Sequence, residues 1–250
     1  MKPAPFAWEA PPGLAAAVTT LRNPEARAMT GGQSLGPMLN LRAARPGIVV
    51  PLAGLAGLHG VEDTAEALTL GAATTHAAIA DGRTPDIMLG GRPILARIAA
   101  GIAYHAVRTR GTIGGSICHA DPAADWLITL TALGAIVLTT ERAVALPSFL
   151  TGPYSTVLAP GELVRAIRIP RPPAAAGWGY YKLCRKPGEF AHAMAACLVT
   201  GTTRIVIGAV GGKPVVTSPE GAEAALGFLD PVDRQLQLVA MRRALAEAGA

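Results

Sequence analysis

Two glycine-rich segments, about eighty positions apart, constrain this chain more than any other feature. The first runs Ala28-Met-Thr-Gly-Gly-Gln-Ser-Leu35 and the second runs Gly111-Thr-Ile-Gly-Gly-Ser116. Each is followed by an apolar stretch that can form a helix. Because glycine tolerates positive φ and carries no Cβ, such segments can turn several main-chain N–H groups toward one anion. Together they predict a ligand with two phosphates, held from both sides.

The alternative for each segment alone is a tight turn between a strand and a helix. Neither segment is a GxGxxG fingerprint or a GxxxxGK[ST] loop, which disfavours a doubly wound Rossmann domain. The second segment continues through His119 to Asp121-Pro-Ala-Ala-Asp125, at the start of a helix predicted over 122–133. We expect Asp121 to cap that helix and Asp125 to accept hydrogen bonds from ligand hydroxyls.

Composition narrows the class of protein. With 250 residues, 50% of them hydrophobic and 16% charged, the chain can fold as one large domain or two modest ones. The net charge is +5, but the basic residues are isolated and do not alternate with aromatic ones, which argues against nucleic-acid binding. The longest apolar run, 126–140, is too short and too rich in threonine to span a membrane.

The chain shows no spacing typical of a metal site and no apparent set of partner residues for a nucleophilic catalyst. Its three cysteines lack CxxC spacing and fit a reducing, cytoplasmic compartment. We do not expect Ser34 or Ser116 to be a nucleophile, because no triad partner is apparent for either serine. We expect His59, His76, His105 and His192 to be surface or capping groups, and we leave open whether His119 caps a helix or lies near a ligand. Tyr181 and Phe190 fit either core packing or stacking on an aromatic ligand.

Helix and strand signals alternate along the chain and predict an α+β protein. A proline- and alanine-rich stretch, 171–177, is the predicted linker, with a domain boundary near residue 172. Helices are predicted over 12–21, 37–42, 76–81, 93–100, 122–133, 220–228 and 234–248. Strands are predicted over 26–29, 48–50, 68–71, 135–140, 163–169, 180–183, 193–199 and 204–210.

Four motifs in order resemble a known family. They are Thr30-Gly-Gly-Gln-Ser-Leu with Met38-Leu-Asn-Leu-Arg42, Thr112-Ile-Gly-Gly-Ser through Asp125, Leu158-Ala-Pro-Gly-Glu-Leu through Pro170, and Tyr181-Lys-Leu-Cys-Arg-Lys-Pro-Gly-Glu-Phe-Ala191. This set is similar to the flavoprotein (medium) subunits of molybdenum hydroxylases, including carbon monoxide dehydrogenases, and to the flavin domain of xanthine dehydrogenases.

The resemblance implies a two-lobed FAD-binding domain of the PCMH type over 1–171, with subdomains of about 1–55 and 56–171, and a small α+β domain over 172–250. It implies FAD contacts for a set of main-chain and side-chain groups. The pyrophosphate would lie on Ala28, Met29, Thr30, Gly31, Gly32, Gln33, Ser34 and Leu35, together with Thr112, Ile113, Gly114, Gly115 and Ser116. Asp125 would hold the ribityl or adenosine side, Val164 would line the flavin pocket, and Lys182 would lie beside the flavin.

Two positions depart from the family pattern. Ile102 is aliphatic where relatives place an aromatic side chain, and Glu189 stands where an aspartate is usual.

The resemblance further implies a large partner subunit with a molybdenum cofactor and a small partner subunit with [2Fe-2S] clusters. Electrons would leave to NAD, a quinone or oxygen. The alternatives are a free-standing FAD-dependent oxidase or reductase, and an assembly subunit that lacks the cofactor.

Overall fold

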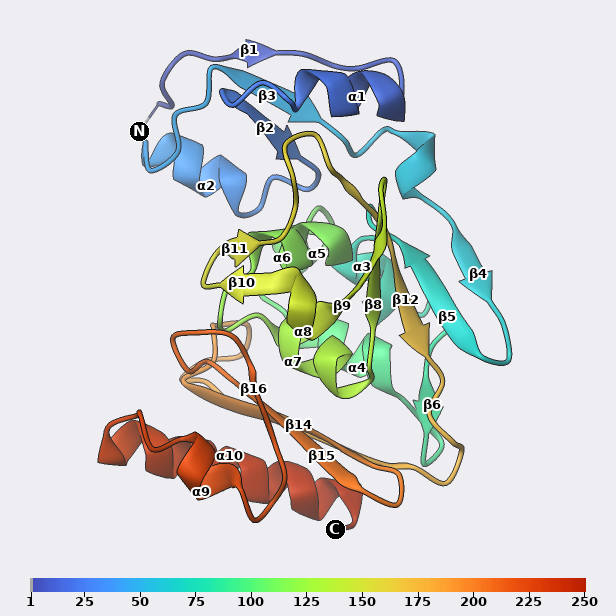
Figure 1. The fold of residues 1–250 in the computed structure, drawn as a ribbon, viewed down its shortest axis with the longest axis vertical. Coiled ribbons are helices and arrows are strands. Elements are labelled where there is room, and N and C mark those ends of the chain that lie inside the picture. Colours follow the sequence, from blue (N-terminus) through green and yellow to red (C-terminus); the bar gives the residue numbers. More distant parts are fainter. Residues whose placement is uncertain (1) are drawn as a thin grey trace.

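The computed structural model describes residues 2–250 and stacks three layers along the long axis of the molecule (Figure 1). Each layer contains one main β-sheet with helices packed on it. This arrangement is the α+β architecture that the alternating signals predict. Within the described residues, no helix has both the length and the apolar character needed to cross a bilayer.

The N-terminal layer is a small parallel sheet of strand order β1-β3-β2. Its strands are β1 (Ala7–Trp8), β2 (Ala26–Met29) and β3 (Ile48–Pro51), and its helices are α1 (Leu14–Thr20), α2 (Leu35–Asn40) and the 3-10 turn η1 (Ala56–Leu58). The predicted strand 26–29 is confirmed, and β2 pairs with β3 from Ala26 to Met29. The first glycine segment therefore connects the carboxyl end of β2 to α2.

The middle layer is a five-stranded antiparallel sheet of order β4-β5-β12-β8-β9. Its strands are β4 (Val61–Asp63), β5 (Ala67–Gly71), β8 (Ile136–Thr139), β9 (Ala143–Ala145) and β12 (Val164–Pro170). Its helices are α3 (His76–Ala80), α4 (Ile94–Ala100), α5 (His105–Arg108), α6 (Ile113–His119), α7 (Asp125–Ala132) and α8 (Leu146–Phe149). Two short hairpins complete it: β6 (Met88–Leu89) with β7 (Arg92–Pro93), and β10 (Leu150–Gly152) with β11 (Ser155–Thr156).

The second glycine segment differs from the expectation, because its glycines lie inside helix α6 rather than in a loop. The hydroxyl of Thr112 caps α6 by accepting the N–H of Gly115 at 3.1 Å. Gly114 packs so closely on Ala72 that a Cβ there would lie 2.5 Å from the Cβ of Ala72. Tertiary packing thus outweighs the low helix propensity of glycine.

The helix predicted over 122–133 begins three residues late. Ala120 is left-handed (φ 51°), and α7 starts only at Asp125. Asp121 accepts the N–H of Ala123 at 2.9 Å in a local turn, so the prediction that it caps the helix is wrong. No side chain of the described residues caps α7.

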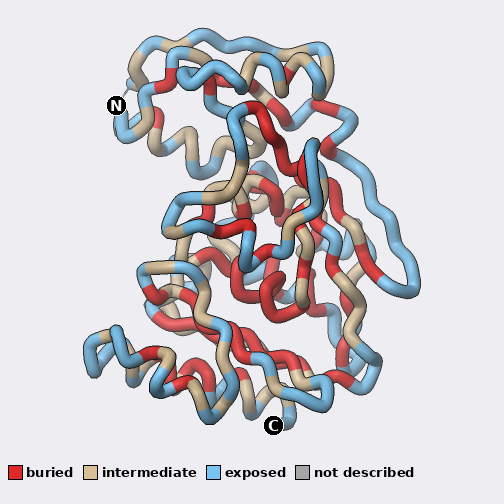
Figure 2. The backbone as a smooth tube through the Cα atoms, viewed as in Figure 1, coloured by how far each residue is buried: buried red, intermediate tan, exposed pale blue. Residues whose placement is uncertain are grey.

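The C-terminal layer is an antiparallel meander covered by helices on both faces. It comprises β13 (Gly177–Leu183), β14 (Ala193–Val199), β15 (Thr203–Gly208) and β16 (Val215–Thr217), followed by α9 (Ala222–Ala225) and α10 (Pro231–Ala248). Along β14, Met194, Ala196 and Leu198 join the core of the middle layer. The alternate residues Ala193, Ala195 and Cys197 pack with α10, so β14 is buried on both faces (Figure 2).

The predicted linker 171–177 is fixed at both ends. Arg171 donates to the carbonyl oxygens of Thr64 (2.9 Å) and Asp86 (3.2 Å) and pairs with Asp63. At the other end, strand β13 begins at Gly177, where a Cβ would lie 2.2 Å from the carbonyl oxygen of Ala248 in α10. The C-terminal layer is therefore tightly docked rather than tethered.

Candidate functional site

The fold brings the two glycine segments into direct contact. A Cβ on Gly31 would lie 2.0 Å from the carbonyl oxygen of Arg110, the residue just before the second segment. A Cβ on Gly115 would lie 3.8 Å from the hydroxyl of Thr30. Gly32 has φ +70°, a conformation that favours glycine. Only glycine at position 31 permits this approach of the two main chains.

The first segment presents main-chain donors without protein partners. In the part of the chain that the structure describes, no hydrogen bond is donated by the N–H groups of residues 30–35. The next N–H, that of Gly36, donates to the carbonyl oxygen of Gly32 at 2.9 Å. Gln33 and Ser34 are exposed, and Thr30 to Gly32 are partly exposed. Free N–H groups ahead of α2 are suited to phosphate oxygens.

The second segment contributes differently, because most of its N–H groups, those of Gly111 and residues 113–116, already have acceptors. Ile113 donates to Thr74 (3.0 Å) and Gly114 donates to Ala72 (3.0 Å), in both cases to a carbonyl oxygen. Gly115 and Ser116 donate to the side chain and the main chain of Thr112. The expectation of two similar N–H clusters therefore fits the first segment alone. Gly115 and Ser116 are still partly exposed at the contact.

A buried histidine packs against the start of the second segment. His76 is 5% exposed, and its Nδ1 accepts the indole N–H of Trp126 at 3.1 Å. A Cβ on Gly111 would lie 2.9 Å from the ring, so glycine is required there too. Burial, assisted by the charge of Arg108, lowers the pKa of His76 to about 4. The expectation of a surface or capping role for His76 is wrong.

A buried ion pair joins the middle and C-terminal layers. Lys182 on β13 donates to both carboxylate oxygens of Asp125, at 2.9 and 3.0 Å, and lies 3.5 Å from the carbonyl oxygen of Gly101. The hydroxyl of Tyr180 donates to Asp125 at 2.6 Å. The two charged side chains are only 6% and 10% exposed. Asp125 lies in the first turn of α7 and Lys182 lies just past the last turn of α4, so both helix dipoles favour the pair.

The other residues singled out from the sequence differ in how far they are buried. Val164 is buried at the start of β12 and belongs to the central core, against which Ile102 also packs. Phe190 is 64% exposed, so it is not a core residue. Tyr181 lies on the α10 side of β13, where the guanidinium of Arg243 is 4.8 Å from its ring centroid.

His119 lies beyond the glycines of α6 and contacts the β10–β11 hairpin. Its ring centroid is 5.2 Å from that of Tyr154, whose hydroxyl donates to Asp121 at 3.2 Å. Partial burial lowers the pKa of His119, against the opposing charge of Asp121. Among the described residues, no group of three or more histidine, cysteine, aspartate or glutamate side chains is arranged to hold a metal ion.

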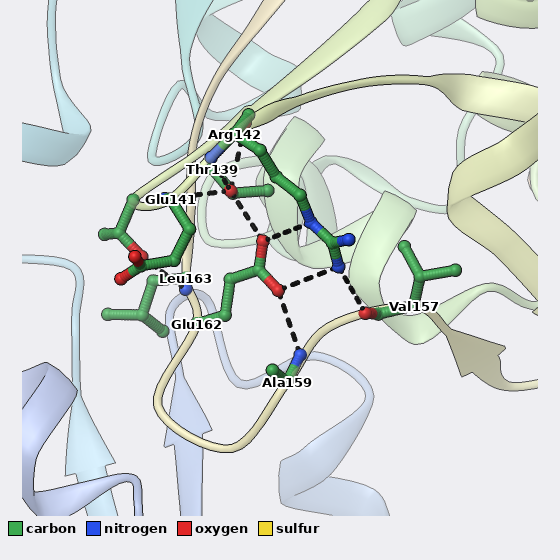
Figure 3. Close-up of polar contacts among 8 residues, drawn as sticks. Thr139, Glu141, Arg142, Val157, Ala159, Glu162 and Leu163 are labelled. Carbon is green, nitrogen blue, oxygen red and sulfur yellow. Dashed lines mark hydrogen bonds and ion pairs between the residues drawn. The ribbon is translucent and has the colours of Figure 1, made fainter.

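Sequence reasoning missed a polar cluster that braces the middle layer (Figure 3). One oxygen of Glu162 accepts the hydroxyl of Thr139 (2.7 Å) and Nε of Arg142 (3.0 Å). The other accepts Nη2 of Arg142 (3.1 Å) and the N–H of Ala159 (3.0 Å). All four donors converge on one carboxylate, which fixes the β8–β9 hairpin to the loop before β12. No local pattern marks this cluster, because its members are about twenty residues apart.

Comparison with known proteins identifies the family to which the chain is similar. Residues 4–172 match the family described as the FAD binding domain in molybdopterin dehydrogenase. The carbon monoxide dehydrogenase medium chain of Afipia carboxidovorans is 35% identical over 257 residues, which cover 100% of this chain and 88% of that protein. The 6-hydroxypseudooxynicotine dehydrogenase complex subunit alpha of Paenarthrobacter nicotinovorans is 37% identical over 180 residues, which cover 70% of this chain and 60% of that protein.

Two solved structures are similar over nearly the whole chain. Reconstituted CO dehydrogenase from Oligotropha carboxidovorans superposes with a TM-score of 0.87 at 30% identity, and the match covers 99% of both chains. Quinoline 2-oxidoreductase from Pseudomonas putida 86 superposes with a TM-score of 0.84 at 29% identity, and the match covers 100% of this chain and 99% of that one.

Proposed function

The chain belongs to the family of FAD-binding domains in molybdopterin dehydrogenases, and from this premise we propose how it works as the FAD-binding medium subunit of a molybdenum hydroxylase. Its task is to receive electrons from the iron–sulfur clusters of a partner subunit and to pass them to an external acceptor. When bound, FAD supplies the ability to accept electrons singly and release them in pairs. The chain itself binds and orients the cofactor.

The observation that carries the proposal is the contact between the two glycine segments. The unpaired N–H groups of residues 30–35 suit the FAD pyrophosphate, as does the absence of Cβ atoms at Gly31 and Gly32. We assign the pyrophosphate to the main chain of residues 28–35 and to the facing surface of residues 112–116. In the second segment, Gly115 and Ser116 contribute through their partly exposed backbone and hydroxyl, since the N–H groups there are engaged.

The buried pair Asp125 and Lys182 supplies the second part of the proposed site. Asp125 would accept hydrogen bonds from the ribityl or adenosine hydroxyls, and Lys182 would lie beside the flavin. Both side chains lie where the middle and C-terminal layers meet, so docking of the two layers positions them together. Val164 would line the flavin pocket from β12, where its backbone can contribute although its side chain is buried.

Partner subunits complete the proposed enzyme. Cys118, Cys184 and Cys197 are unpaired thiols, and the described residues hold no cluster of metal ligands, so iron–sulfur and molybdenum centres are assigned to other chains. We propose a large subunit with the molybdenum cofactor, a small [2Fe-2S] subunit, and NAD, a quinone or oxygen as acceptor. Free thiols also support a cytoplasmic location.

The decisive experiment measures flavin content and turnover. Protein purified without added cofactor, or after incubation with FAD and gel filtration, should release about one FAD per chain on denaturation. A chain that holds no FAD under either condition would be an assembly subunit instead. Oxidation of a small substrate by the flavin-loaded chain alone would favour a free-standing oxidase or reductase.

A further inference from the structure

Tyr180 contacts Asp125, a residue of the proposed flavin site. It lies two positions before Lys182 on β13, so both side chains emerge on the same face of the strand. That face contacts α7 and Asp125, whereas Tyr181 points to α10. The main chain of Tyr180 is also fixed, because its N–H donates to Glu247 at 3.0 Å, and Glu247 pairs with Arg97 of α4.

The hydroxyl of Tyr180 is available only as a donor toward Asp125. Burial and the neighbouring carboxylate raise the pKa of Tyr180 well above its ordinary value, so the phenol stays protonated. Its hydrogen bond to Asp125 measures 2.6 Å, within the range expected for a phenol on an ionised oxygen. Oδ1 of Asp125 thus receives both Tyr180 and Lys182, while Oδ2 receives Lys182 alone.

We infer that Tyr180 is a positioning residue, which orients and partly neutralises the Asp125 carboxylate and thereby fixes the charge of Lys182 beside FAD. The inference rests on the proposed place of Lys182. Without the phenol, the carboxylate would carry a more concentrated negative charge and would attract the ammonium group more strongly. In a buried site, where charges are weakly screened, both changes oppose the addition of electrons to a neighbouring flavin.

The test is the midpoint potential of bound FAD in the purified full chain with Tyr180→Phe. We expect FAD to remain bound and its potential to become more negative than in the unchanged chain. Tyr181→Phe is the matched control, because it removes a tyrosine hydroxyl one position along the same strand, on the opposite face. Its potential should be unchanged. In an Asp125→Asn background, Tyr180→Phe should produce no further shift.

Other outcomes separate the two proposals. A Tyr180→Phe chain that binds FAD with an unchanged potential overturns the positioning role and leaves the flavoprotein function standing. A parent chain that binds no FAD overturns both. If the phenylalanine variant does not fold, 3-fluorotyrosine at position 180 keeps the shape and strengthens the donor. It should shift the potential in the positive direction, and an unchanged potential would overturn the inference.

Discussion

Gly31 lies directly against the carbonyl oxygen of Arg110, so close that a methyl group at position 31 would come within 2.0 Å of that oxygen and 2.9 Å of the Cα of Gly111. This contact sets the spacing between the free N–H groups ahead of α2 and Gly115 of α6. Any side chain at position 31 must push the N-terminal and middle layers apart.

Gly31→Ala should therefore abolish retention of FAD through gel filtration. Gly36→Ala is the matched control, because nothing lies within 4 Å of a Cβ there and the residue is inside α2. We expect the control to keep FAD, without the stability gain usual for Gly→Ala inside a helix, because Pro37 follows it and disfavours a Cβ-bearing residue in the helical conformation. Full FAD content in Gly31→Ala would contradict the proposed pyrophosphate site.

Removing one partner of the buried pair Asp125–Lys182 should lower the free energy of unfolding even when no cofactor is bound. Among the described residues, Lys182→Met leaves the buried Asp125 with Tyr180 as its only donor, and we expect a loss of about 3–5 kcal/mol in unfolding free energy. Adding Asp125→Asn should restore much of the loss, because no charge then remains unpaired. Urea denaturation of flavin-free protein measures both, and equal stabilities of the single and double variants would refute the pairing.

The depressed pKa of His76 predicts a pH dependence of stability. The folded value is about 4 against 6.5 for the free side chain, so between these values the unfolded chain binds more protons. Stability should be complete above pH 6.5 and should fall, by roughly 3 kcal/mol, as the pH drops toward 4. Urea denaturation from pH 7 to pH 4 tests this, and His76→Gln should flatten the profile in that window.

The Glu162 cluster predicts a second, more acidic dependence. Burial acts to raise the pKa of Glu162, but hydrogen bonds from Arg142, Ala159 and Thr139 outweigh it and hold the pKa below 4.5. The resulting stability is present above pH 4.5 and is lost as the pH falls through the folded pKa.

Glu162→Gln should lower the unfolding free energy at pH 7 by about 2 kcal/mol and weaken the acid dependence below pH 4.5. Glu141→Gln alters an exposed carboxylate on the same hairpin and should change neither. Thermal unfolding followed by circular dichroism at pH 7 and pH 4 compares the two variants. Equal behaviour would show that Glu162 does not brace the hairpin.

Local signals predicted the longer strands and the connection that carries the first glycine segment. The run 193–199 and the strand 26–29 were recognisable from apolar pattern and turn residues, and both have the predicted bounds. The glycine pair in the first segment marked a real connection between β2 and α2. These features depend on residues that are neighbours in the sequence.

Features that depend on distant residues were not predictable in this way. Helix α6 forms through glycines because Gly114 packs on Ala72, and His76 is buried because Trp126 covers it. The pairing of Lys182 with Asp125 requires β13 to lie beside α7, which no local pattern reveals. The resemblance singled out both residues without indicating that they contact each other.

The boundary between the middle and C-terminal layers carries charges in crossed order. Asp125 of the middle layer pairs with Lys182 of the C-terminal layer. In the second pair the signs are reversed, because the middle layer contributes the cation Arg97 and the C-terminal layer contributes the anion Glu247. A chimera spliced near residue 172 must therefore import both complementary groups at the same places. A graft that lacks either group would leave an unpaired ion at the junction, so we expect this chain to accept a foreign C-terminal unit only if that unit carries both groups.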